Sequence, residues 1–552
     1  MPVFNRFDRS NLVVDLLSGV TTAVVALPLS LAFGIASGAG PAAGLYGAVA
    51  VGLFAALFGG TPTLISEPTG PMTVVMTAVI ANLTALDPDN GLALAFLVVS
   101  LAGVLQIILG SLRVGRYVTM MPYSVISGFM TGIGVILVVL QIGPLLGSPT
   151  PPGGVLGTLS RVPEFVAEVR PAELMMAALT LAVLLLTPAS VRRRVPPHLV
   201  ALLIGTGIAA LLFPGDAVRR IGAFSAALPA LRLPPLSAAV IPTLLLDALV
   251  LAVLGSIDAL LTSTIADTLT RTEHDSSKEL IGQGIGNVVA GMVGGIAGAG
   301  STMPTVLNIR SGARSATSGL ARSLILAAVV FWASPLTAGI PTAVLAAIVC
   351  KVGIDILDWS FIRRAHRASG EAALIMYSVM ALTVFVDLMV AVAAGLFVAN
   401  IVTIRRLSEA QSQSVRVITA ADDGIRLSDE ERSLLRRPEA RVLLLSLSGP
   451  MIFGVARAIS REHRAISRCD VLVLDLSELS LLDVTVALAI ENVIAEIRET
   501  RRRLLVVVSA QGVPDRLARL GVFDGLDADQ IVSDRTEALR RAVAPSISPS
   551  VG

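Results

Sequence analysis

The sequence predicts an α-helical polytopic membrane domain over residues 1–406, followed by a small α/β domain. The chain is 54% hydrophobic and only 15% charged, whereas a soluble protein of this length carries about a quarter charged residues. The charges are also unevenly placed: of 42 Lys and Arg and 40 Asp and Glu, 21 of each lie in the last 148 residues, which leaves 21 and 19 for the first 404. One part of the chain is therefore suited to lipid and the other to water.

Twelve apolar stretches are candidate membrane spans, since a helix needs about 20 apolar residues to cross the hydrocarbon. They lie at 12–35, 42–59, 92–112, 120–146, 172–189, 197–213, 240–266, 280–299, 317–334, 339–356, 371–386 and 387–404. Two further stretches, Pro68–Leu83 and Thr302–Ile309, are too short or too broken to be ordinary spans. Together they predict about fourteen segments.

The short connections predict the orientation. Lys and Arg gather in alternate connections, and such basic connections face the cytoplasm, so both termini are expected inside. The polar stretch 1–11 leads directly into a first span rather than a cleaved signal peptide. The net charge of +2 gives no reason to expect nucleic acid as a partner.

The two broken segments resemble each other. One reads GGTPTLISEPTGPMTVV from Gly59, and the other reads GGIAGAGSTMPTVL from Gly294. Each is third in a set of seven segments if the chain divides into halves of about 12–213 and 240–404. Because seven is odd, the two sets have opposite orientations in the membrane. Paired interruptions of this kind indicate an inverted repeat with a binding site at the membrane midplane. The alternative is that Pro and Gly merely kink two helices.

At such a site two half-helices direct their N-termini at each other. The first is expected to begin near Pro68 with Thr69 and Gly70 at its tip, and the second near Ser301 with Thr302 one residue on. Free N–H groups and the positive ends of helix dipoles favour an anion there. The Thr and Ser hydroxyls add hydrogen-bond donors without charge.

Asp258 lies inside the apolar run LGSIDALLTSTIAD. A carboxylate in lipid costs several kcal/mol unless it is paired, protonated or bound to a cation. Thr262 lies four residues on, on the same helix face, and with carbonyls near Gly300 it completes an all-oxygen set suited to a small hard cation. The alternative is a protonated Asp258 bonded to a neighbouring helix. No Lys or Arg is predicted at the midplane, and the role of Glu67 is open.

Other motifs indicate structure rather than chemistry. GQGIGN at Gly282–Asn287 lies inside a span with no strand before it, so helix packing explains it better than nucleotide binding. The four His residues lie in or beside polar stretches and are expected to be solvated. No Ser–His–Asp arrangement or His/Cys cluster suggests an enzyme.

The C-terminal part shows a βαβ rhythm. After a polar linker at 407–440, strands are predicted at RVLLLSL from Arg441, VLVLDLS from Val471 and LLVVVSA from Leu504, with helices at 453–466 and 485–500. Such alternation indicates a small α/β domain, here about 441–545. Thr485 is a candidate cap of the second helix. The domain looks regulatory or dimerising.

Taken together, these residues resemble the SulP anion-transporter family over essentially the whole chain. The likeness rests on SGVTTAVVALPLSLAFGIASGAG, LISEPTGPMTVV, TMMPYSVISGFM, DTLTRTEH, KELIGQGIGNVVAG and GPMIFGVA, and within the family it points to the sodium-dependent bicarbonate branch. The resemblance implies fourteen segments in two inverted repeats and a cytoplasmic STAS domain. It also implies that bicarbonate contacts Thr69, Ser301 and Thr302, and that sodium contacts Asp258, Thr262, Gly300 and Thr302.

Two positions depart from the family pattern. Ser301 stands where the bicarbonate branch has Ala, and Pro304 stands where many members carry Arg. Without that Arg, a bound sodium ion would supply the positive charge, which suits a monoanion. We therefore expect sodium-coupled bicarbonate uptake by alternating access, in a homodimer of the cell's inner membrane joined through the STAS domain. The alternatives are another anion (sulfate, a dicarboxylate or chloride) with proton coupling, or a membrane-anchored sensor.

Overall fold

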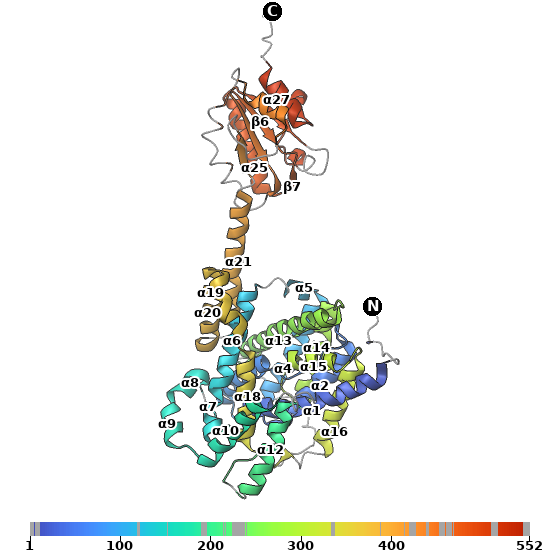
Figure 1. The fold of residues 1–552 in the computed structure, drawn as a ribbon, viewed down its shortest axis with the longest axis vertical. Coiled ribbons are helices and arrows are strands. Elements are labelled where there is room, and N and C mark those ends of the chain that lie inside the picture. Colours follow the sequence, from blue (N-terminus) through green and yellow to red (C-terminus); the bar gives the residue numbers. More distant parts are fainter. Residues whose placement is uncertain are drawn as a thin grey trace, which may run out of the picture. The chain divides into compact units, whose positions relative to one another are not determined.

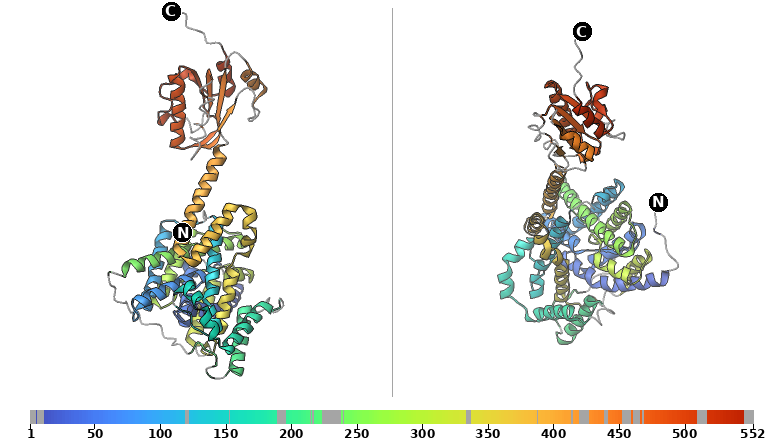
Figure 2. Two further views of the ribbon diagram at one scale, coloured as in Figure 1. Left: turned by 90° about the vertical axis from the view of Figure 1, so that its left-hand side faces the viewer. Right: turned by 45° about the horizontal axis from the view of Figure 1, so that its top comes forward.

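The computed structural model describes residues 5, 11–118, 122–151, 153–188, 196–213, 215, 217–222, 238, 240–332, 337–386, 388–412, 415–418, 427–437, 441–451, 459, 466, 469–508 and 517–544. The chain divides into two compact units, Met1–Phe397 and Val398–Gly552. The first is helical and the second is built around a β-sheet (Figures 1 and 2). Each unit is described by itself.

The helical unit contains α1 (Leu12–Ala36), α2 (Pro41–Phe58), α3 (Gly70–Leu86), α4 (Gly91–Ser111), α5 (Gly115–Val118), α6 (Tyr123–Leu140), α7 (Ile142–Leu146), α8 (Gly154–Ser160), α9 (Val162–Ala167), α10 (Pro171–Leu186), α12 (Pro197–Leu212), α13 (Ile241–Thr270), α14 (Ser276–Met292), α15 (Thr302–Arg310), α16 (Thr317–Trp332), α18 (Thr342–Ile356), α19 (Trp359–Ala368) and α20 (Gly370–Phe385). Helix α21 (Leu388–Ser412) crosses the boundary between the units.

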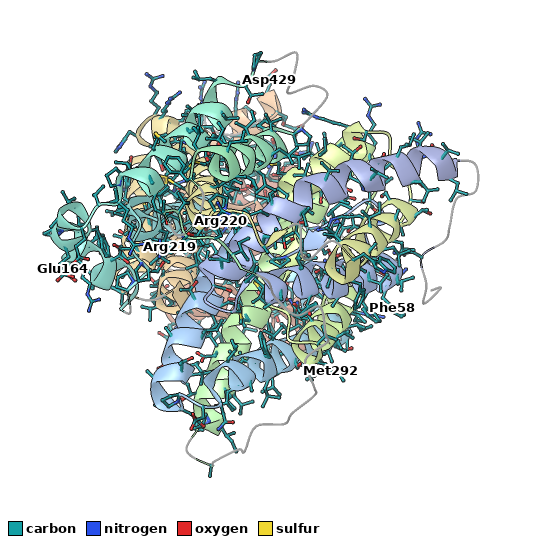
Figure 3. All side chains as sticks on the ribbon, turned by 90° about the horizontal axis from the view of Figure 1, so that it is seen from below. Phe58, Glu164, Arg219, Arg220, Met292 and Asp429 are labelled. Atoms are coloured by element: carbon teal, nitrogen blue, oxygen red, sulfur yellow. The ribbon has the colours of Figure 1, made fainter. Side chains whose placement is uncertain are left out.

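Length and composition make five stretches of described helix able to cross a membrane: Leu12–Ala36, Pro41–Phe58, Gly91–Ser111, Tyr123–Leu146 and Ile241–Thr270. Shorter apolar helices are α3, α10, α12, α16 and α20. Most side-chain atoms in the view of Figure 3 are carbon. Among the large apolar side chains, Leu186, Leu211 and Trp332 are between 77% and 81% exposed. An apolar surface of this kind is suited to lipid. The total of fourteen segments stays a prediction.

Glycines let α14 pack closely on α2 and α4. A Cβ on Gly284 would lie 2.6 Å from the Gly103 carbonyl oxygen, and a Cβ on Gly103 would lie 2.5 Å from that of Gly284. One on Gly282 would lie 2.4 Å from the backbone nitrogen of Gly59. Only glycine permits this approach. The interpretation of the GQGIGN stretch as a packing motif is confirmed.

The two broken segments meet in the structure. Strands β1 (Ser66–Glu67) and β2 (Ala299–Gly300) pair antiparallel, with Ser66 opposite Gly300. Helix α3 begins at Gly70, after Pro68 and Thr69 that follow β1, and α15 begins at Thr302, after Ser301 that follows β2. The antiparallel pairing aims the two helices in opposite directions from a common crossing. This is the inverted geometry that the sequence predicts, with the first helix starting two residues later than expected.

The C-terminal unit contains β3 (Val415–Ile418), α22 (Asp429–Leu435), β4 (Val442–Leu447), β5 (Gly449–Met451), β6 (Val471–Asp475), β7 (Leu479–Leu482), α25 (Val484–Glu499), β8 (Arg503–Val507), η2 (Ala528–Gln530), β9 (Ile531–Val532) and α27 (Arg535–Val543). Its main sheet has the order β3-β4-β6-β8-β9, with β4, β6, β8 and β9 parallel and β3 antiparallel; β5 and β7 form a second, parallel pair.

Alternating side chains divide the C-terminal core between the two faces of the main sheet. Leu443 and Leu445 of β4 belong to the cluster that includes α25, whereas Val442 and Leu444 belong to the cluster that includes α22 and α27. This follows from the two-residue period of a strand. The stretch 407–440, expected as a polar linker, contains β3 and α22, because Ile418, Leu434 and Leu435 are buried in the second cluster.

One predicted cap is wrong. Helix α25 begins at Val484, and its cap is Asp483, whose Oδ1 accepts the Val484 N–H at 2.7 Å. Thr485 lies inside the helix. Asp is at least as good a cap as Thr. The helix predicted at 453–466 lies almost entirely outside the described residues.

Candidate functional site

The tip of α3 touches the acid of α13. Thr69, the N-cap of α3, donates from Oγ1 to Asp258 Oδ2 at 2.8 Å, and it also accepts the Met72 N–H. The backbone of α3 therefore fixes the hydroxyl that reaches Asp258. Asp258 lies in the middle of the 30-residue helix α13 and is only 8% exposed. Its other carboxylate oxygen is left for a second ligand or a proton.

A second contact joins α13 to the other half-helix. Thr262 donates to the Gly300 carbonyl at 2.9 Å, and its Oγ1 lies 3.0 Å from Thr302 Oγ1. Since Thr262 is one turn along from Asp258, each half-helix meets the same face of α13 at a different turn. The structure thus brings five of the seven candidate residues into two hydrogen-bonded groups around that face: Thr69 with Asp258, and Thr262 with Gly300 and Thr302. Gly70 and Ser301 are chain neighbours of these residues.

Ser301, the seventh candidate, is the N-cap of α15. Its backbone N–H donates to the Ile65 carbonyl at 2.8 Å, and its side chain makes no capping bond. The half-buried hydroxyl is therefore not needed to hold the helix start. Gly70 lies where a Cβ would come within 2.7 Å of Ile356 on α18 and 2.9 Å of Leu137 on α6, so the tip of α3 lies close to both helices.

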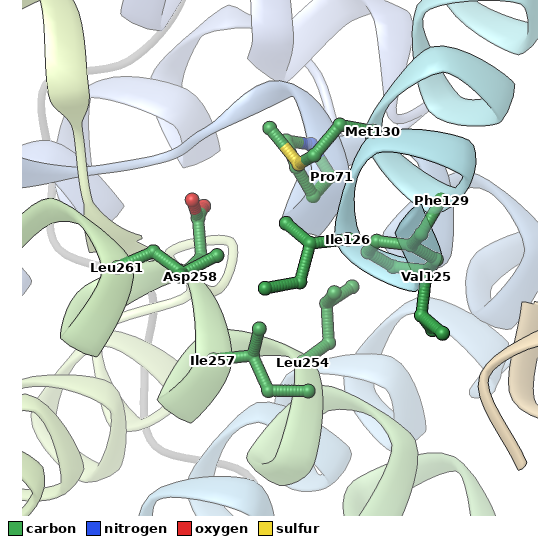
Figure 4. A pocket seen from close by; sticks show the side chains of 9 residues that line it. All are labelled: Pro71, Val125, Ile126, Phe129, Met130, Leu254, Ile257, Asp258 and Leu261. Carbon is green, nitrogen blue, oxygen red and sulfur yellow. The ribbon is translucent and has the colours of Figure 1, made fainter. Parts of the chain in front are cut away.

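A small cavity borders Asp258 between α3, α6 and α13 (Figure 4). Its volume is about 10 Å³. Its lining is apolar except for Asp258: Pro71, Val125, Ile126, Phe129, Met130, Leu254, Ile257 and Leu261. An opening of this size admits about one water molecule. A polyatomic anion would need α6 to move relative to α3 and α13.

The prediction of a membrane midplane without Lys or Arg did not take Arg322 into account. This residue of α16 is fully buried, forms an ion pair with Glu67 of β1, and donates to the Ser66 carbonyl at 3.2 Å. Gly52 of α2 makes room for it, because a Cβ there would lie 2.7 Å from Arg322 Nη1. The signal in the sequence was a lone Arg in a predicted span, which is rarely without a partner. Glu67 is that partner.

Other buried polar side chains hold the backbone before each half-helix. Gln283 donates to the Ser66 hydroxyl at 2.5 Å and to Glu279 at 2.9 Å. Asn287 donates to the Gly298 carbonyl and accepts the Gly298 N–H, both at 2.9 Å. Buried amides of this kind satisfy backbone groups that a broken helix leaves unpaired. Extended backbone can therefore persist inside an apolar unit.

The expectation that His274 is solvated is wrong. Its side chain is 9% exposed; Nδ1 lies 2.6 Å from Asp267 Oδ2, and Nε2 lies 2.9 Å from Ser276 Oγ. The connection between α13 and α14 thus holds a Ser–His–Asp arrangement that the sequence interpretation did not foresee. The N–H groups of Ser277 and Lys278 beside it both donate to Asp275. These two N–H groups are therefore not available to stabilise an oxyanion.

Comparison with known families decides the class of protein. Residues 12–379 match the model of the sulfate permease family, and residues 436–538 match that of the STAS domain. The chain belongs to the sulfate permease (SulP) family. It is a multi-pass membrane transporter by family, and the predicted fold class, a SulP transmembrane domain with a C-terminal STAS domain, is confirmed.

Two similar proteins are named bicarbonate transporter BicA. That of a Picosynechococcus species is 54% identical over 547 residues, which cover 98% of this chain and 97% of that protein. That of a Synechocystis species is 56% identical over 543 residues, with coverage of 98% and 96%. A putative sulfate transporter of Bacillus subtilis, YvdB, is 29% identical over 531 residues, with coverage of 94% and 96%.

Solved structures agree with the fold. The transmembrane domain of a cyanobacterial bicarbonate transporter, BicA, has a TM-score of 0.68 at 58% identity and covers 71% of this chain and 100% of its own. The murine Solute Carrier 26 family member A9 anion transporter, in an inward-facing state, has a TM-score of 0.81 at 18% identity, with coverage of 97% and 92%. The second likeness extends over both units and concerns the fold alone.

Proposed function

We propose that this protein takes up bicarbonate together with sodium by alternating access at the crossing of α3 and α15. The observation that carries the proposal is the contact of Thr69 with Asp258, which joins the tip of an anion-favouring half-helix to a buried carboxylate. The identity of 54% and 56% to two bicarbonate transporters over nearly the whole chain supports the choice of anion.

Charge balance supports the coupling. Each half-helix N-terminus contributes roughly half a positive charge, and Asp258 contributes a full negative charge when ionised. The pair Arg322 and Glu67 adds no net charge. The empty site therefore has little net charge to attract an anion, and a sodium ion at Asp258 and Thr262 would provide it. We assign sodium to Asp258, Thr262, Gly300 and Thr302, and bicarbonate to Thr69, Gly70, Ser301 and Thr302.

The test is uptake of labelled bicarbonate into proteoliposomes with and without an inward sodium gradient. We expect uptake only with sodium, and sulfate in equal concentration should compete poorly because a second negative charge meets no further cation. Linkage requires that sodium raise bicarbonate affinity by the same factor by which bicarbonate raises sodium affinity. Sodium-independent uptake would contradict the proposal.

A second candidate is proton-coupled transport of another anion, such as sulfate, a dicarboxylate or chloride. It is favoured by the position of Asp258 against an apolar cavity, where a protonated carboxyl is also stable, and by the 29% identity to a putative sulfate transporter. The same proteoliposomes decide between the two. Uptake that follows an imposed pH gradient in sodium-free buffer would favour the second candidate.

The remaining assignments follow from this function. We place the protein in the inner membrane with both termini in the cytoplasm, and we propose a homodimer through the STAS domain. We propose no enzymatic activity, because the Ser276–His274–Asp267 arrangement has its neighbouring N–H groups occupied by Asp275. A sensor without transport would bind bicarbonate but show no uptake in the same assay.

A further inference from the structure

We propose that Glu67 sets both the cation requirement and the anion charge preference of the site, by cancelling the charge of Arg322. The inference rests on the proposed function and deepens it. Both side chains are fully buried, with side-chain exposures of 1% and 0%. They form an ion pair, so β1 carries a compensated positive charge directly before the anion-favouring half-helix.

The pair lies close enough to act on the site. Glu67 precedes Thr69 by two residues, which places their Cα atoms at most about 7 Å apart, and Thr69 touches Asp258. Glu67 also pairs with Ala299, directly before the Gly300 carbonyl that accepts from Thr262. A charge uncovered at Glu67 or Arg322 would therefore face both half-helix tips through a water-poor interior.

Stability alone is a poor explanation for the pair. Glu67 Oε1 and Arg322 Nε have no hydrogen-bond partner among the residues that the structure describes. A buried ion pair with unsatisfied atoms contributes little net stability, and apolar residues of similar volume often replace such pairs without loss. What Arg322 does provide is a donor to the Ser66 and Ala48 carbonyls, at 3.2 Å and 3.5 Å, which fastens β1 to α2.

This arrangement creates a conflict that Glu67 resolves. The hydrogen bonds between β1 and α2 need a long cationic donor. An uncompensated guanidinium at this place would, however, attract anions without sodium and would favour divalent ones. Glu67 removes the charge and leaves the donor in place. One further acid is linked to the same segment: Glu279 bonds Gln283, which bonds the Ser66 hydroxyl. Glu279 does not contact Arg322, so Glu67 is the carboxylate that cancels it.

The two single neutralisations should have opposite effects. Glu67→Gln leaves Arg322 uncompensated, so bicarbonate should bind more tightly without sodium, sodium should bind more weakly, and sulfate should compete more strongly. Arg322→Gln leaves Glu67 uncompensated, so sodium should bind more tightly and bicarbonate more weakly. A unit charge at roughly 10 Å with an effective dielectric constant of about 20 corresponds to shifts on the order of tenfold.

The experiment is labelled bicarbonate uptake by full-length protein in proteoliposomes, with sodium titrations and sulfate competition. The double variant Glu67→Gln with Arg322→Gln removes one positive and one negative charge, so the net charge near the site is unchanged. Its sodium dependence and sulfate exclusion should therefore stay within about threefold of wild type. The matched control is Glu173→Gln. It neutralises the buried acid of another Glu–Arg pair, in which the partner Arg219 lies 3.3 Å away and is partly exposed. Glu173 lies on α10, which packs on α7, α12 and α18. It should leave both properties unchanged.

Shifts of the two single variants in the same direction, or unchanged sodium and sulfate dependence in both, would overturn the inference. If Arg322→Gln does not fold, Glu67→Gln decides, because its amide keeps the volume and can still accept from Arg322. A double variant that has lost sulfate exclusion would also overturn it. Failure of the proposed function looks different: wild-type protein would then take up no bicarbonate in response to sodium, whatever the variants do.

Discussion

The helical unit and the C-terminal unit use buried polar side chains in different ways. In the helical unit Asp258, Glu67 and Arg322 are buried beside two interrupted helices. In the C-terminal unit the buried acids Asp475 and Glu431 share one cation, Arg535, whose side chain is partly exposed. The first set surrounds the backbone between helices, where the regular hydrogen bonding of a helix is interrupted. The second fastens regular elements to one another.

This difference shows where function is to be sought. Interrupted backbone in an apolar unit is expensive, since every N–H and C=O there needs a partner. The helical unit meets this need with amides and hydroxyls, such as Asn287 on both backbone groups of Gly298. A small α/β sheet has no such need, and we interpret the cluster of Glu431, Asp475 and Arg535 as structural. Changes in the first set should therefore alter transport, and changes in the second should alter stability.

The largest effect is expected for Asp258→Asn. The amide keeps the hydrogen bond from Thr69 but cannot offset a cation, so sodium-dependent uptake should fall by about a hundredfold or more, with the fold retained. The control is Asp355→Asn, which neutralises an acid of α18 paired with Lys351 at 2.5 Å. Uptake of bicarbonate with normal sodium stimulation in Asp258→Asn would refute the cation assignment.

A smaller but still large effect is expected for Gly300→Ala. Its Cβ would lie 3.0 Å from the Ala259 Cα, which is backbone of α13 and yields only if the helix shifts. The Thr262 bond to Gly300 should lengthen, and sodium affinity should fall by about tenfold, the loss of roughly one hydrogen bond. Gly70→Ala is the comparison: its Cβ meets only the ends of the Ile356 and Leu137 side chains, which can rotate. Equal losses in both variants would show that crowding, not the α13 contact, matters.

Much of this site could be predicted from the sequence because its residues are conspicuous there. Asp258 lies deep in a long apolar run, and the two Gly- and Pro-rich interruptions occur at corresponding places. The partners of these residues could not be predicted. Nothing in the sequence joins Glu67 to Arg322, since the pair spans 255 positions, and nothing shows that Thr69 points at Asp258 rather than into a cavity.

The fold shows the same division. Apolar length predicted most helices to within a few residues, and the strands β4, β6 and β8 follow the predicted apolar runs. Polar composition concealed β3 and α22 in 407–440, because each is short and lies in a stretch of mostly polar residues.

A modest effect on transport is expected when the chain is ended after Leu407. The two units are compact by themselves and joined through α21, as separable domains are. Sodium-dependent uptake should stay within about threefold of wild type, while dimerisation weakens or regulation changes. Light scattering gives the oligomeric state and the proteoliposome assay gives the uptake. A stable truncated protein that no longer binds bicarbonate would place part of the site in the C-terminal unit.

The smallest effect concerns pH and the C-terminal unit. Burial by itself would raise the pKa of Glu431, but hydrogen bonds from Arg535, the Ser428 N–H and Thr536, together with the charge of Arg535, bring that pKa below its usual value of 4.5. Arg535 lies 2.9 Å from Glu431 and 3.3 Å from Asp475, so it ties α22 to α27 and to β6.

The sign of the pH effect follows from the lowered pKa. A carboxylate with a lowered pKa in the folded state stabilises it fully above the ordinary pKa, and the contribution is lost as pH falls through the lowered value. Hydrogen exchange of α22 amides in the full-length protein should therefore be steady from neutral pH to about 5 after correction for intrinsic rates, and should quicken below that. In Arg535→Gln the loss should begin at higher pH, because the cation that lowers the pKa is gone. Bicarbonate uptake at neutral pH should be unchanged in this variant, and a clear loss would mean that this cluster serves transport as well as structure.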